Sequence, residues 1–441
     1  MKKAVITLIA SCCISCMAMA QNGRNEYYLL CHESAYGEGA AYALSPDGVH
    51  FHDIICGYPA SLPESLSVIA GGLSVDNQIE NIYDISPLTL EKAARPGSFM
   101  LLGEEEYGKF QAWSDSEEDK YLAQDVNNPV FKGLHADPEV LYSEQTGKYY
   151  IYPTTDGSYG WHNHDFRCFS SSDLKEWKDE GVILDLQDLD WGKEYAWAPC
   201  IIEKPIYKDK KHKKISGYKY YFYFVANKSI GVAVADRPEG PFTDVLGRPL
   251  LEQSEIQAPN IVIDPDVFQD PATGKYYLYW GNSYMWMAEL ADDMVSFVPG
   301  TMHEMIPRNK IGEYHYLEGT YVFERNGLYY FMWSENITRS AKYCIRYLIS
   351  DSPAELIRNG KPAKVEEQVV LQMAPEKQIF GTGHNSVLNI PGTDEWYMIY
   401  HRFVRPEGIK MGLSGGYNRE ICIDRMYFNP DGTIRPVIPT L

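Results

Sequence analysis

Three carboxylates and one imidazole stand at the start of similar stretches of this sequence. Asp137, Asp264, Glu318 and His384 each begin an extended, aromatic-rich run. The distances to the aromatic residues of these runs are 12, 12, 11 and 12 positions, to Tyr149, Tyr276, Tyr329 and Trp396. Two carboxyl groups across a pocket can cut a glycosidic bond with inversion, because one activates water and the other protonates the leaving oxygen. A third carboxylate raises the pKa of the acid by like-charge repulsion, so that the acid keeps its proton near neutral pH.

Each of these residues is a weak indicator when it is taken alone. An Asp before Pro at a strand start, as at Asp137 and Asp264, is more often a turn former than a catalyst. Strand stability, however, does not require an acid at one repeat position in several copies. A ring of unpaired acids near an axis would cost on the order of several kcal/mol without a function or a bound cation. The set therefore indicates a functional site.

The elements that must position these residues form a repeat. A fifth copy begins at Ala198, where a lysine-rich stretch, 208–214, lengthens the count to 22. Beyond each leading pair, alternating apolar and polar residues bounded by Gly, Pro, Asp and Asn indicate a third and a fourth strand. Repeated β units bury their faces against their neighbours and close into a propeller. We therefore predict an all-β fold with a five-bladed β-propeller, in which the three carboxylates and the imidazole converge on one axis.

The first twenty residues predict a signal peptide. Lys2 and Lys3 precede an apolar run, residues 4–10, and Ala18-Met19-Ala20 is typical of a cleavage site. We expect cleavage after Ala20 and a secreted or periplasmic protein. A lipoprotein box that ends at Cys12 is the disfavoured alternative, since the apolar run before it is short.

Two segments remain after residues 1–20. Residues 21–126 form an N-terminal extension with β-like sequence, which could be a partial extra blade, a cap over the ring or a small module. Residues 127–441 form the predicted propeller. The boundary between the two is defined to within about ten residues.

Charge and hydropathy exclude several classes of partner. The chain carries 40 Lys and Arg against 60 Asp and Glu, a formal charge of −20, and removal of Lys2 and Lys3 with the signal makes it 38 − 60 = −22. Such an acidic protein repels nucleic acid and anionic lipid and suits a neutral polysaccharide or oligosaccharide. No later stretch has the 18 or more apolar residues of a membrane span. We expect a monomer, and the lysine-rich stretch 208–214 is interpreted as a solvated loop.

The cysteines do not predict a metal site or a disulfide framework. Three of the nine lie in the predicted signal, and the other six are scattered over different repeats. Most are expected to be buried thiols. Cys31 and Cys56 could form a bridge if the compartment is oxidising.

The motifs around these residues resemble those of glycoside hydrolase family 43 from about residue 127 to Leu441. They are His-Ala-Asp137-Pro-Glu-Val, Ile-Asp264-Pro-Asp-Val-Phe, Leu-Glu318-Gly-Thr, Ser-Ser-Asp173-Leu-Lys-Glu-Trp177, Ala235-Asp-Arg-Pro-Glu-Gly-Pro-Phe242 and Gly383-His384-Asn-Ser. The resemblance implies a five-bladed propeller enzyme that acts with inversion, with Asp137 as general base, Asp264 as the residue that raises the pKa of the acid, and Glu318 as general acid. His384 corresponds to the family's axial histidine, which in many members binds a calcium ion or water. No cofactor is implied for the chemistry itself.

The resemblance also implies residues that contact the sugar. Trp197 and Arg419 correspond to positions that contact the sugar in the subsite of the cleaved residue. The alternatives are a core aromatic for Trp197 and a structural ion pair for Arg419. His401, with Arg402 beside it, and Trp161 at the rim are further candidates.

The resemblance implies several substrates. The family's commonest are α-L-arabinofuranosides and β-D-xylosides of plant polysaccharides, and an arabinofuranosidase is the favoured interpretation. Galactan or galactofuranoside cleavage, a sugar-binding propeller without catalysis, and a retaining enzyme of the fructan-cleaving kind are the alternatives. Thr320 stands where many members have Pro, and the long N-terminal extension is not part of the family pattern, so linkage preference stays open.

Overall fold

The computed structural model divides the chain into two compact units, which are described separately. The first comprises Met1–Asp125, Pro375–Gln378 and Val404–Gly415, and the second comprises Val126–Ala374, Ile379–Phe403 and Gly416–Leu441. The residues that the structure describes are 27–33, 40–46, 52–53, 64–70, 99–122, 128–209, 214–256, 262–306, 313–358, 361–362, 365–406, 408 and 411–441. The predicted signal peptide and Cys56 lie outside them. Among the described residues, no helix is both long and apolar enough to cross a bilayer.

The first unit contains a four-stranded sheet and two helices. The strand order is β3–β2–β1–β4, with β1 at Tyr27–Glu33, β2 at Ala40–Ser45, β3 at His52–Asp53 and β4 at Phe99–Leu102. Helix α2 spans Glu64–Ile69 and helix α4 spans Glu104–Leu122. Three glutamates in the first turn of α4 complement the positive end of the helix dipole, and the Glu106 carboxylate accepts a bond of 2.9 Å from the Gly103 N–H. Leu29, Leu44 and Phe110 pack in the core between sheet and helices.

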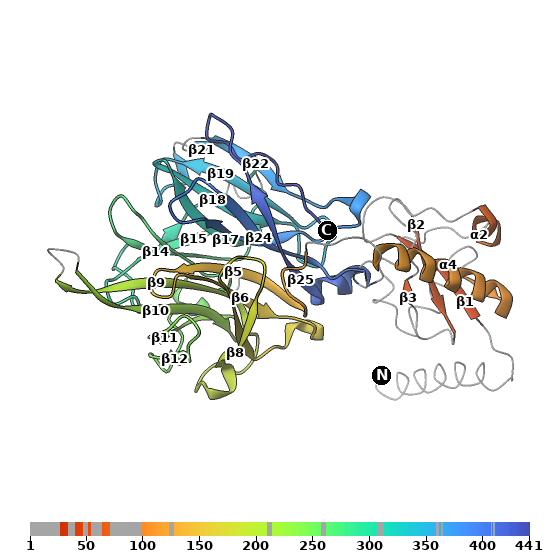
Figure 1. The fold of residues 1–441 in the computed structure, drawn as a ribbon, viewed down its shortest axis with the longest axis horizontal. Coiled ribbons are helices and arrows are strands. Elements are labelled where there is room, and N and C mark those ends of the chain that lie inside the picture. The colour runs from red at the N-terminus through yellow and green to blue at the C-terminus, as the bar shows by residue number, and fades with distance from the viewer. Residues whose placement is uncertain are drawn as a thin grey trace, which may run out of the picture. The chain divides into compact units, whose positions relative to one another are not determined.

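The described residues of the second unit form five antiparallel sheets of three or four strands, which follow one another along the chain (Figure 1). The first sheet holds β5 (His135–Ser143), β6 (Lys148–Thr155), β7 (Asp165–Ser171) and β8 (Lys178–Asp185). The second holds β9 (Trp197–Asp209), β10 (Lys214–Ala226), β11 (Ser229–Ala235) and β12 (Thr243–Asp244). The third holds β13 (Asp266–Gln269), β14 (Tyr276–Trp280), β15 (Trp286–Leu290) and β16 (His303–Glu304). The fourth holds β17 (Glu318–Arg325), β18 (Leu328–Glu335), β19 (Cys344–Ser350) and β22 (Val365–Leu371), and the fifth holds β23 (Gly383–Asn389), β24 (Trp396–Phe403) and β25 (Arg419–Met426).

Short elements complete the described part of the chain. A two-stranded sheet pairs β20 (Ile357–Arg358) with β21 (Lys361–Pro362). Single 3-10 turns lie at Tyr159–Trp161, Leu186–Asp188, Gln253–Glu255, Pro375–Lys377 and Gly412–Tyr417. The prediction of an all-β fold with little helix is confirmed.

The first strands of the five sheets contact one another in cyclic order. The contacts are β5 with β9, β9 with β13, β13 with β17, β17 with β23, and β23 with β5. Five apolar clusters lie between consecutive sheets, and one of them joins the fifth sheet to the first through Ile399 and Ile151. Because the middle strands are covered on both faces, they read as continuous apolar runs. All five residues of Tyr276–Trp280 are buried.

The first strands share a left-handed residue where they approach the common axis. Asp137, Ala198, Asp264, Gly319 and His384 have φ angles of 47°, 38°, 57°, 66° and 44°. Non-glycine residues rarely adopt such angles, and they do so mostly where the surrounding structure fixes them. In the first, fourth and fifth sheets the strand register shifts at this point, which is the mark of a β-bulge.

Glu318 lies one residue before this shared position. The ladder pairs Glu318 with Ser334, and the left-handed residue of the fourth sheet is Gly319. The counterpart of Glu318 in the second sheet is Trp197, which precedes Ala198 in the same way. The prediction that the acids share one repeat position is therefore wrong for Glu318. The shorter spacing of 11 residues in its copy arises in the turn: two residues separate the paired Arg325 and Leu328, whereas four separate Ser143 and Lys148 in the first sheet.

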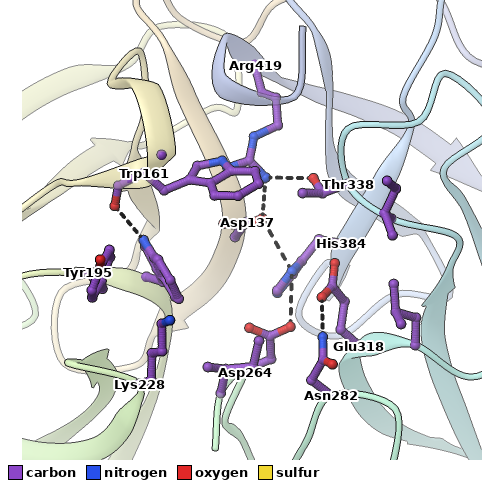
Figure 2. Close-up of a pocket in the computed structure, with 15 residues that line it drawn as sticks. Asp137, Trp161, Tyr195, Lys228, Asp264, Asn282, Glu318, Thr338, His384 and Arg419 are labelled. Carbon is purple, nitrogen blue, oxygen red and sulfur yellow. Dashed lines mark hydrogen bonds and ion pairs between the residues drawn. The ribbon is translucent and has the colours of Figure 1, made fainter. Parts of the chain in front are cut away.

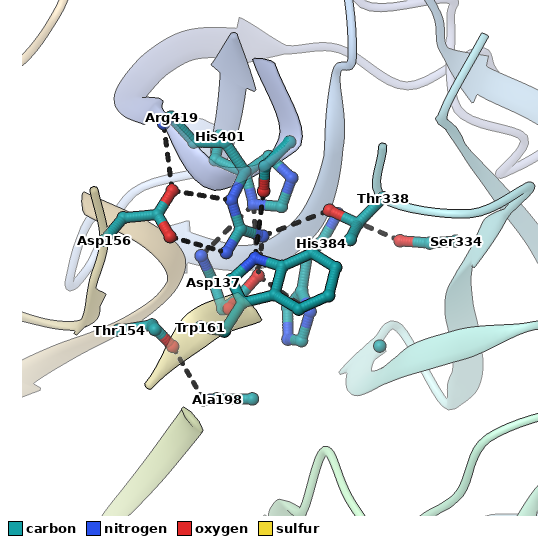
Figure 3. Close-up of polar contacts among 12 residues, drawn as sticks. Asp137, Thr154, Asp156, Trp161, Ala198, Ser334, Thr338, His384, His401 and Arg419 are labelled. Carbon is teal, nitrogen blue, oxygen red and sulfur yellow. Dashed lines mark hydrogen bonds and ion pairs between the residues drawn. The ribbon is translucent and has the colours of Figure 1, made fainter. Parts of the chain in front are cut away.

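Side chains of neighbouring sheets hold four of these left-handed residues, and Figure 3 shows the bond between Ala198 and Thr154. The N–H groups donate to a side chain of the preceding sheet: Ala198 to Thr154 Oγ1 at 2.7 Å, Gly319 to Asp264 Oδ2 at 2.9 Å, His384 to Ser334 Oγ at 2.9 Å, and Asp137 to His401 Nδ1 at 3.2 Å. The last of these bonds joins the fifth sheet to the first. The backbone that carries the candidate site is therefore held by bonds between sheets.

The described cysteines are buried free thiols. They are Cys31, Cys168, Cys200, Cys344 and Cys422. Cys56, the partner suggested for Cys31, lies outside the described residues, as do residues 210–213 of the lysine-rich stretch.

Candidate active site

A pocket of about 480 Å³ opens where the five first strands begin (Figure 2). The three carboxylates predicted to be catalytic all line it, together with His384. The other lining residues are Gly160, Trp161, Tyr195, Trp197, Lys228, Ile263, Asn282, Leu317, Ile337, Thr338 and Arg419. The tertiary structure therefore brings together residues from all five sheets or the segments that join their strands.

Asp137 is a buried carboxylate that lies close to a guanidinium and two imidazole rings. Its Oδ1 lies 3.0 Å from Arg419 Nη1, 3.3 Å from His384 Nδ1 and 3.2 Å from His401 Nδ1. Burial alone would raise the pKa of Asp137, but the charge of Arg419, with His384 and His401, holds that pKa well below its usual range. Asp137 is therefore ionised across the neutral range, as a general base must be.

Glu318 has the opposite protonation preference. Its Oε1 accepts a bond of 3.0 Å from the Tyr343 hydroxyl, and its Oε2 accepts one of 2.8 Å from Asn282 Nδ2. Burial raises the pKa of Glu318 to about 7, and the negative charge of Asp137 acts in the same direction against the two hydrogen bonds. Glu318 therefore holds a proton over much of the range below neutral pH, as a general acid must.

Asp264 is the third carboxylate of the pocket, and its pKa depends on the charges of the other two. Its Oδ2 accepts the N–H of Gly319, the residue after Glu318, at 2.9 Å. Burial raises the pKa of Asp264 well above its usual value, and the charges of Glu318 and Asp137 raise it further. The charge of Glu318 therefore opposes the ionisation of Asp264, whereas the negative charge that raises the pKa of Glu318 is that of Asp137.

Arg419 lies in an ion-pair network at the pocket wall. Its Nε donates to Asp156 Oδ2 at 2.9 Å, its Nη2 to Asp156 Oδ1 at 3.2 Å, and its Nη1 to Thr338 Oγ1 at 3.1 Å as well as to Asp137 (Figure 3). The Asp156 side chain is completely buried. Arg419 thus forms a structural ion pair with Asp156 and also lines the pocket, so both interpretations of this residue hold.

The two tryptophans predicted to contact substrate line the pocket together. Trp197 Nε1 donates to the backbone oxygen of Trp161 at 2.8 Å, and Trp161 Nε1 donates to the backbone oxygen of Gly416 at 3.0 Å. Both indoles are partly exposed, so neither is a fully buried core aromatic. These two hydrogen bonds hold the nitrogen-bearing edge of each indole, and other parts of both rings line the cavity.

His401 and Arg402 lie behind the pocket and do not line it. His401 is completely buried, and its Nδ1 accepts the Asp137 N–H, so the imidazole proton sits on Nε2. Burial and the charge of Arg419 lower the pKa of His401 to about 3, which keeps the ring neutral. Arg402 pairs with Glu420 at 2.7 Å. His401 therefore contacts Asp137 without lining the pocket.

Sequence reasoning does not identify several residues of the site. Asn282 lies two residues after the buried strand β14, and a polar residue near such a strand end is a usable signal. Asp156, Lys228 and Thr338 lie in stretches that read as ordinary turns. Tyr343 is one of 34 tyrosines, most of which pack between sheets, so its type carries no information.

The candidate metal ligand His384 lies between the two aspartates. Its Nδ1 is 3.3 Å from Asp137 Oδ1 and 3.9 Å from Asp264 Oδ2. Within the described ranges, no group of three or more His, Cys, Asp or Glu side chains has the arrangement of a metal site. Calcium takes six to eight oxygen ligands, so these side chains do not by themselves make a calcium site.

Comparison with known proteins agrees with this geometry. A family model described as Glycosyl hydrolases family 43 matches residues 126–434, which confirms the resemblance of the motifs. A β-D-galactofuranosidase of Aspergillus niger is 35% identical over 323 residues, covering 72% of this chain and 86% of that protein. An arabinoxylan arabinofuranohydrolase of Paenibacillus polymyxa is 28% identical over 350 residues, covering 70% of this chain and 51% of that protein. The solved structure of an α-L-arabinofuranosidase of Clostridium thermocellum is similar with a TM-score of 0.52 and 28% identity, over 69% of this chain and 94% of that one. This chain therefore belongs to glycosyl hydrolases family 43 and is a glycosidase that hydrolyses O-glycosyl compounds.

Proposed function

We propose that this chain is a secreted, inverting glycosidase with Asp137 as general base, Glu318 as general acid and Asp264 as the residue that raises the pKa of the acid. One observation carries the proposal: two carboxyl groups that line one pocket have opposite protonation preferences. A pocket that only binds sugar needs hydroxyl partners and has no use for such a contrast.

The reaction follows from these two protonation states. Asp137 removes a proton from a water molecule, which attacks the anomeric carbon, while Glu318 protonates the leaving oxygen on the opposite face of the sugar. The water is consumed and the configuration inverts. Inverting enzymes hold the two groups roughly 6.5 to 9.5 Å apart, which leaves room for that water. The chemistry uses no cation.

The substrate that we favour is an α-L-arabinofuranosyl or β-D-xylosyl residue of a plant polysaccharide. The relatives named as arabinofuranohydrolase and arabinofuranosidase support this assignment. A pocket of about 480 Å³ is large enough for a single terminal sugar, so we expect exo action.

A β-D-galactofuranosyl residue is the second candidate. The relative with 35% identity is named as a galactofuranosidase, and its match covers most of its own length. Galactofuranose and arabinofuranose in these linkages share the configuration of the ring and differ in one exocyclic hydroxymethyl group. Galactofuranosides and arabinofuranosides can therefore both be tested as substrates of this pocket.

The cyclic contacts of the first strands support a five-bladed β-propeller as the catalytic fold. Because the pocket takes residues from all five proposed blades, closure of the ring is part of the catalytic arrangement. The region from residue 126 to 434 that matches the family corresponds to this ring, with the N-terminal extension outside it.

The proposal is tested with nitrophenyl α-L-arabinofuranoside, β-D-xyloside and β-D-galactofuranoside. We expect turnover of at least one of these three glycosides, and proton NMR of the first product should show the inverted anomer. Glu318→Gln and Asp137→Asn should each lower kcat by about 10²- to 10⁴-fold. Turnover at the wild-type level in both variants, or a product of retained configuration, would show that the assignment is wrong.

A further inference from the structure

An exposed tyrosine stands at the mouth of the pocket. The Tyr159 residue is 82% exposed, although a large aromatic surface is normally at least partly covered. The two residues that follow it, Gly160 and Trp161, line the pocket. Tyr159 therefore directly precedes two residues of the pocket wall, and its ring is open to solvent.

The loop that carries Tyr159 is held firmly. The Gly157 N–H donates to the Tyr417 backbone oxygen at 2.7 Å, and the Trp161 N–H donates to the Ser158 backbone oxygen at 3.0 Å. Ser158 Oγ bonds Asn163 Oδ1 at 2.6 Å. The exposure of Tyr159 is thus a property of an ordered loop, and a ligand that binds there does not first have to order it.

Ring contacts connect Tyr159 to the pocket wall. The centroid distances are 5.2 Å from Tyr159 to Tyr417, 4.4 Å from Tyr417 to Trp161, 6.5 Å from Trp161 to Trp197, and 4.7 Å from Trp197 to Tyr195. Of these rings only Tyr417 is buried, and it supports the other two that it touches. A chain of ring contacts therefore connects Tyr159, through the buried Tyr417, with the aromatic residues that line the cavity.

A second exposed apolar residue lies on the same mouth. Ile337 lines the pocket and is 54% exposed. Arg339, two residues later, has its guanidinium 5.1 Å from the centre of the Tyr417 ring, so this loop packs against the support of Tyr159. We call Tyr159 and Ile337 together the apolar lip.

We propose that the apolar lip, with Tyr159 as its main contact, binds the neutral glycan chain that carries the sugar in the pocket. Flat aromatic rings pack on the apolar C–H faces of sugar rings, and the acidic surface of this protein disfavours a polyanionic chain. The proposal rests on the proposed function, because it takes the sugar in the pocket to be the cleaved residue. It deepens that function by making the polymer, and not a small glycoside, the preferred substrate.

The test compares a substrate that fills only the pocket with one that also crosses the lip. Nitrophenyl α-L-arabinofuranoside and arabinoxylan form such a pair, and the corresponding galactofuranosides replace them if the wild type cleaves those. We expect Tyr159→Ala to lower kcat/KM on the polymer at least fivefold and to leave kcat/KM on the aryl glycoside within twofold. Tyr159→Phe should behave like the wild type on both, because the ring and not the hydroxyl makes the contact.

Tyr427→Ala is the matched control. Tyr427 is also an exposed tyrosine of the second unit, at 53%, and it does not line the pocket. It should change neither activity. An unchanged polymer activity in Tyr159→Ala, or an equal loss on both substrates, would overturn the proposal, since the second result would mean that the pocket itself had been damaged.

A binding measurement separates the lip from catalysis. Affinity electrophoresis in arabinoxylan compares Glu318→Gln with the double variant Glu318→Gln/Tyr159→Ala. We expect the second substitution to weaken retardation by about fivefold or more, and equal retardation would overturn the proposal. If the wild type cleaves neither substrate, the proposed function fails, and this binding result still decides the role of the lip.

Discussion

The hydroxyl of Tyr343 lies 3.0 Å from Oε1 of Glu318 and donates a hydrogen bond to it. The Tyr343 ring reaches this place because it packs against Gly383, where a Cβ would lie 2.1 Å from two of the ring atoms. The ring also stacks in parallel with that of His401, with a centroid distance of 5.6 Å and an interplanar angle of 4°. Tyr343 therefore links the candidate acid on the fourth sheet to the fifth sheet, which also supports the candidate base.

Tyr343→Phe should move the alkaline limb of activity to higher pH. The Tyr343 hydrogen bond lowers the pKa of Glu318, against burial, which raises that pKa to about 7. Loss of the bond destabilises the carboxylate form, so the pKa of the acid rises, and we expect the limb of kcat/KM to shift upward by about one pH unit. The pH profile of kcat/KM on an aryl glycoside measures this. Tyr427→Phe is the control, and an unmoved limb would contradict a role of Tyr343 in tuning the acid.

Gly383→Ala should displace the Tyr343 ring. The new methyl group would overlap ring atoms that lie 2.1 Å away, and overpacking of this kind costs about 1–3 kcal/mol. We expect a loss of that size in the free energy of unfolding, measured with urea, and a fall in kcat because the acid loses a positioning bond. Gly217→Ala is the matched control, since nothing lies within 4 Å of a Cβ there. Equal stability of the two variants would show that the ring has another place to go.

Glu318→Gln should stabilise the protein more at pH 8 than at pH 5. The pKa of Glu318 is about 7 in the folded protein against an ordinary 4.5, so the folded state binds this proton more tightly than the unfolded state does. The stability that the proton contributes is present below pH 4.5 and is lost as pH rises toward 7, a loss of about 3 kcal/mol. The neutral amide in the variant does not titrate, so it has no such dependence.

The measurement for that substitution is urea unfolding of the wild type and of Glu318→Gln at both pH values. The free energy difference between the two proteins should grow by about 3 kcal/mol from pH 5 to pH 8. A constant difference would mean that Glu318 titrates near its ordinary pKa, and its assignment as the acid would lose its electrostatic support.

Removal of metal ions should leave the chemistry intact. The described side chains around His384 do not form a metal site, and the proposed reaction needs no cation. We expect EDTA to leave kcat/KM within twofold, and any effect of the chelator or of added calcium to appear in the melting temperature. A loss of turnover that calcium restores would place the ion in the reaction.

The sequence by itself determined the all-β class, the family and the three carboxylates. These features follow from local pattern: strand alternation, turn residues and short motifs are readable within about twenty positions of Asp137 or Asp264. The repeated spacing also carried the idea of a shared axis, since equivalent parts of a repeat meet when the units close.

Only the tertiary structure decided how these residues are supported. Asp156 and Arg419 are 263 positions apart, and the sequence has no signal that such a pair forms. The offset of Glu318 by one residue depends on a bulge and on strand register, which long-range pairing sets. Tyr343 looks like the other tyrosines until packing against Gly383 places its hydroxyl on the acid. Electrostatic strength also depends on burial, so the opposite protonation preferences of Asp137 and Glu318 arise only when the fold removes both from water.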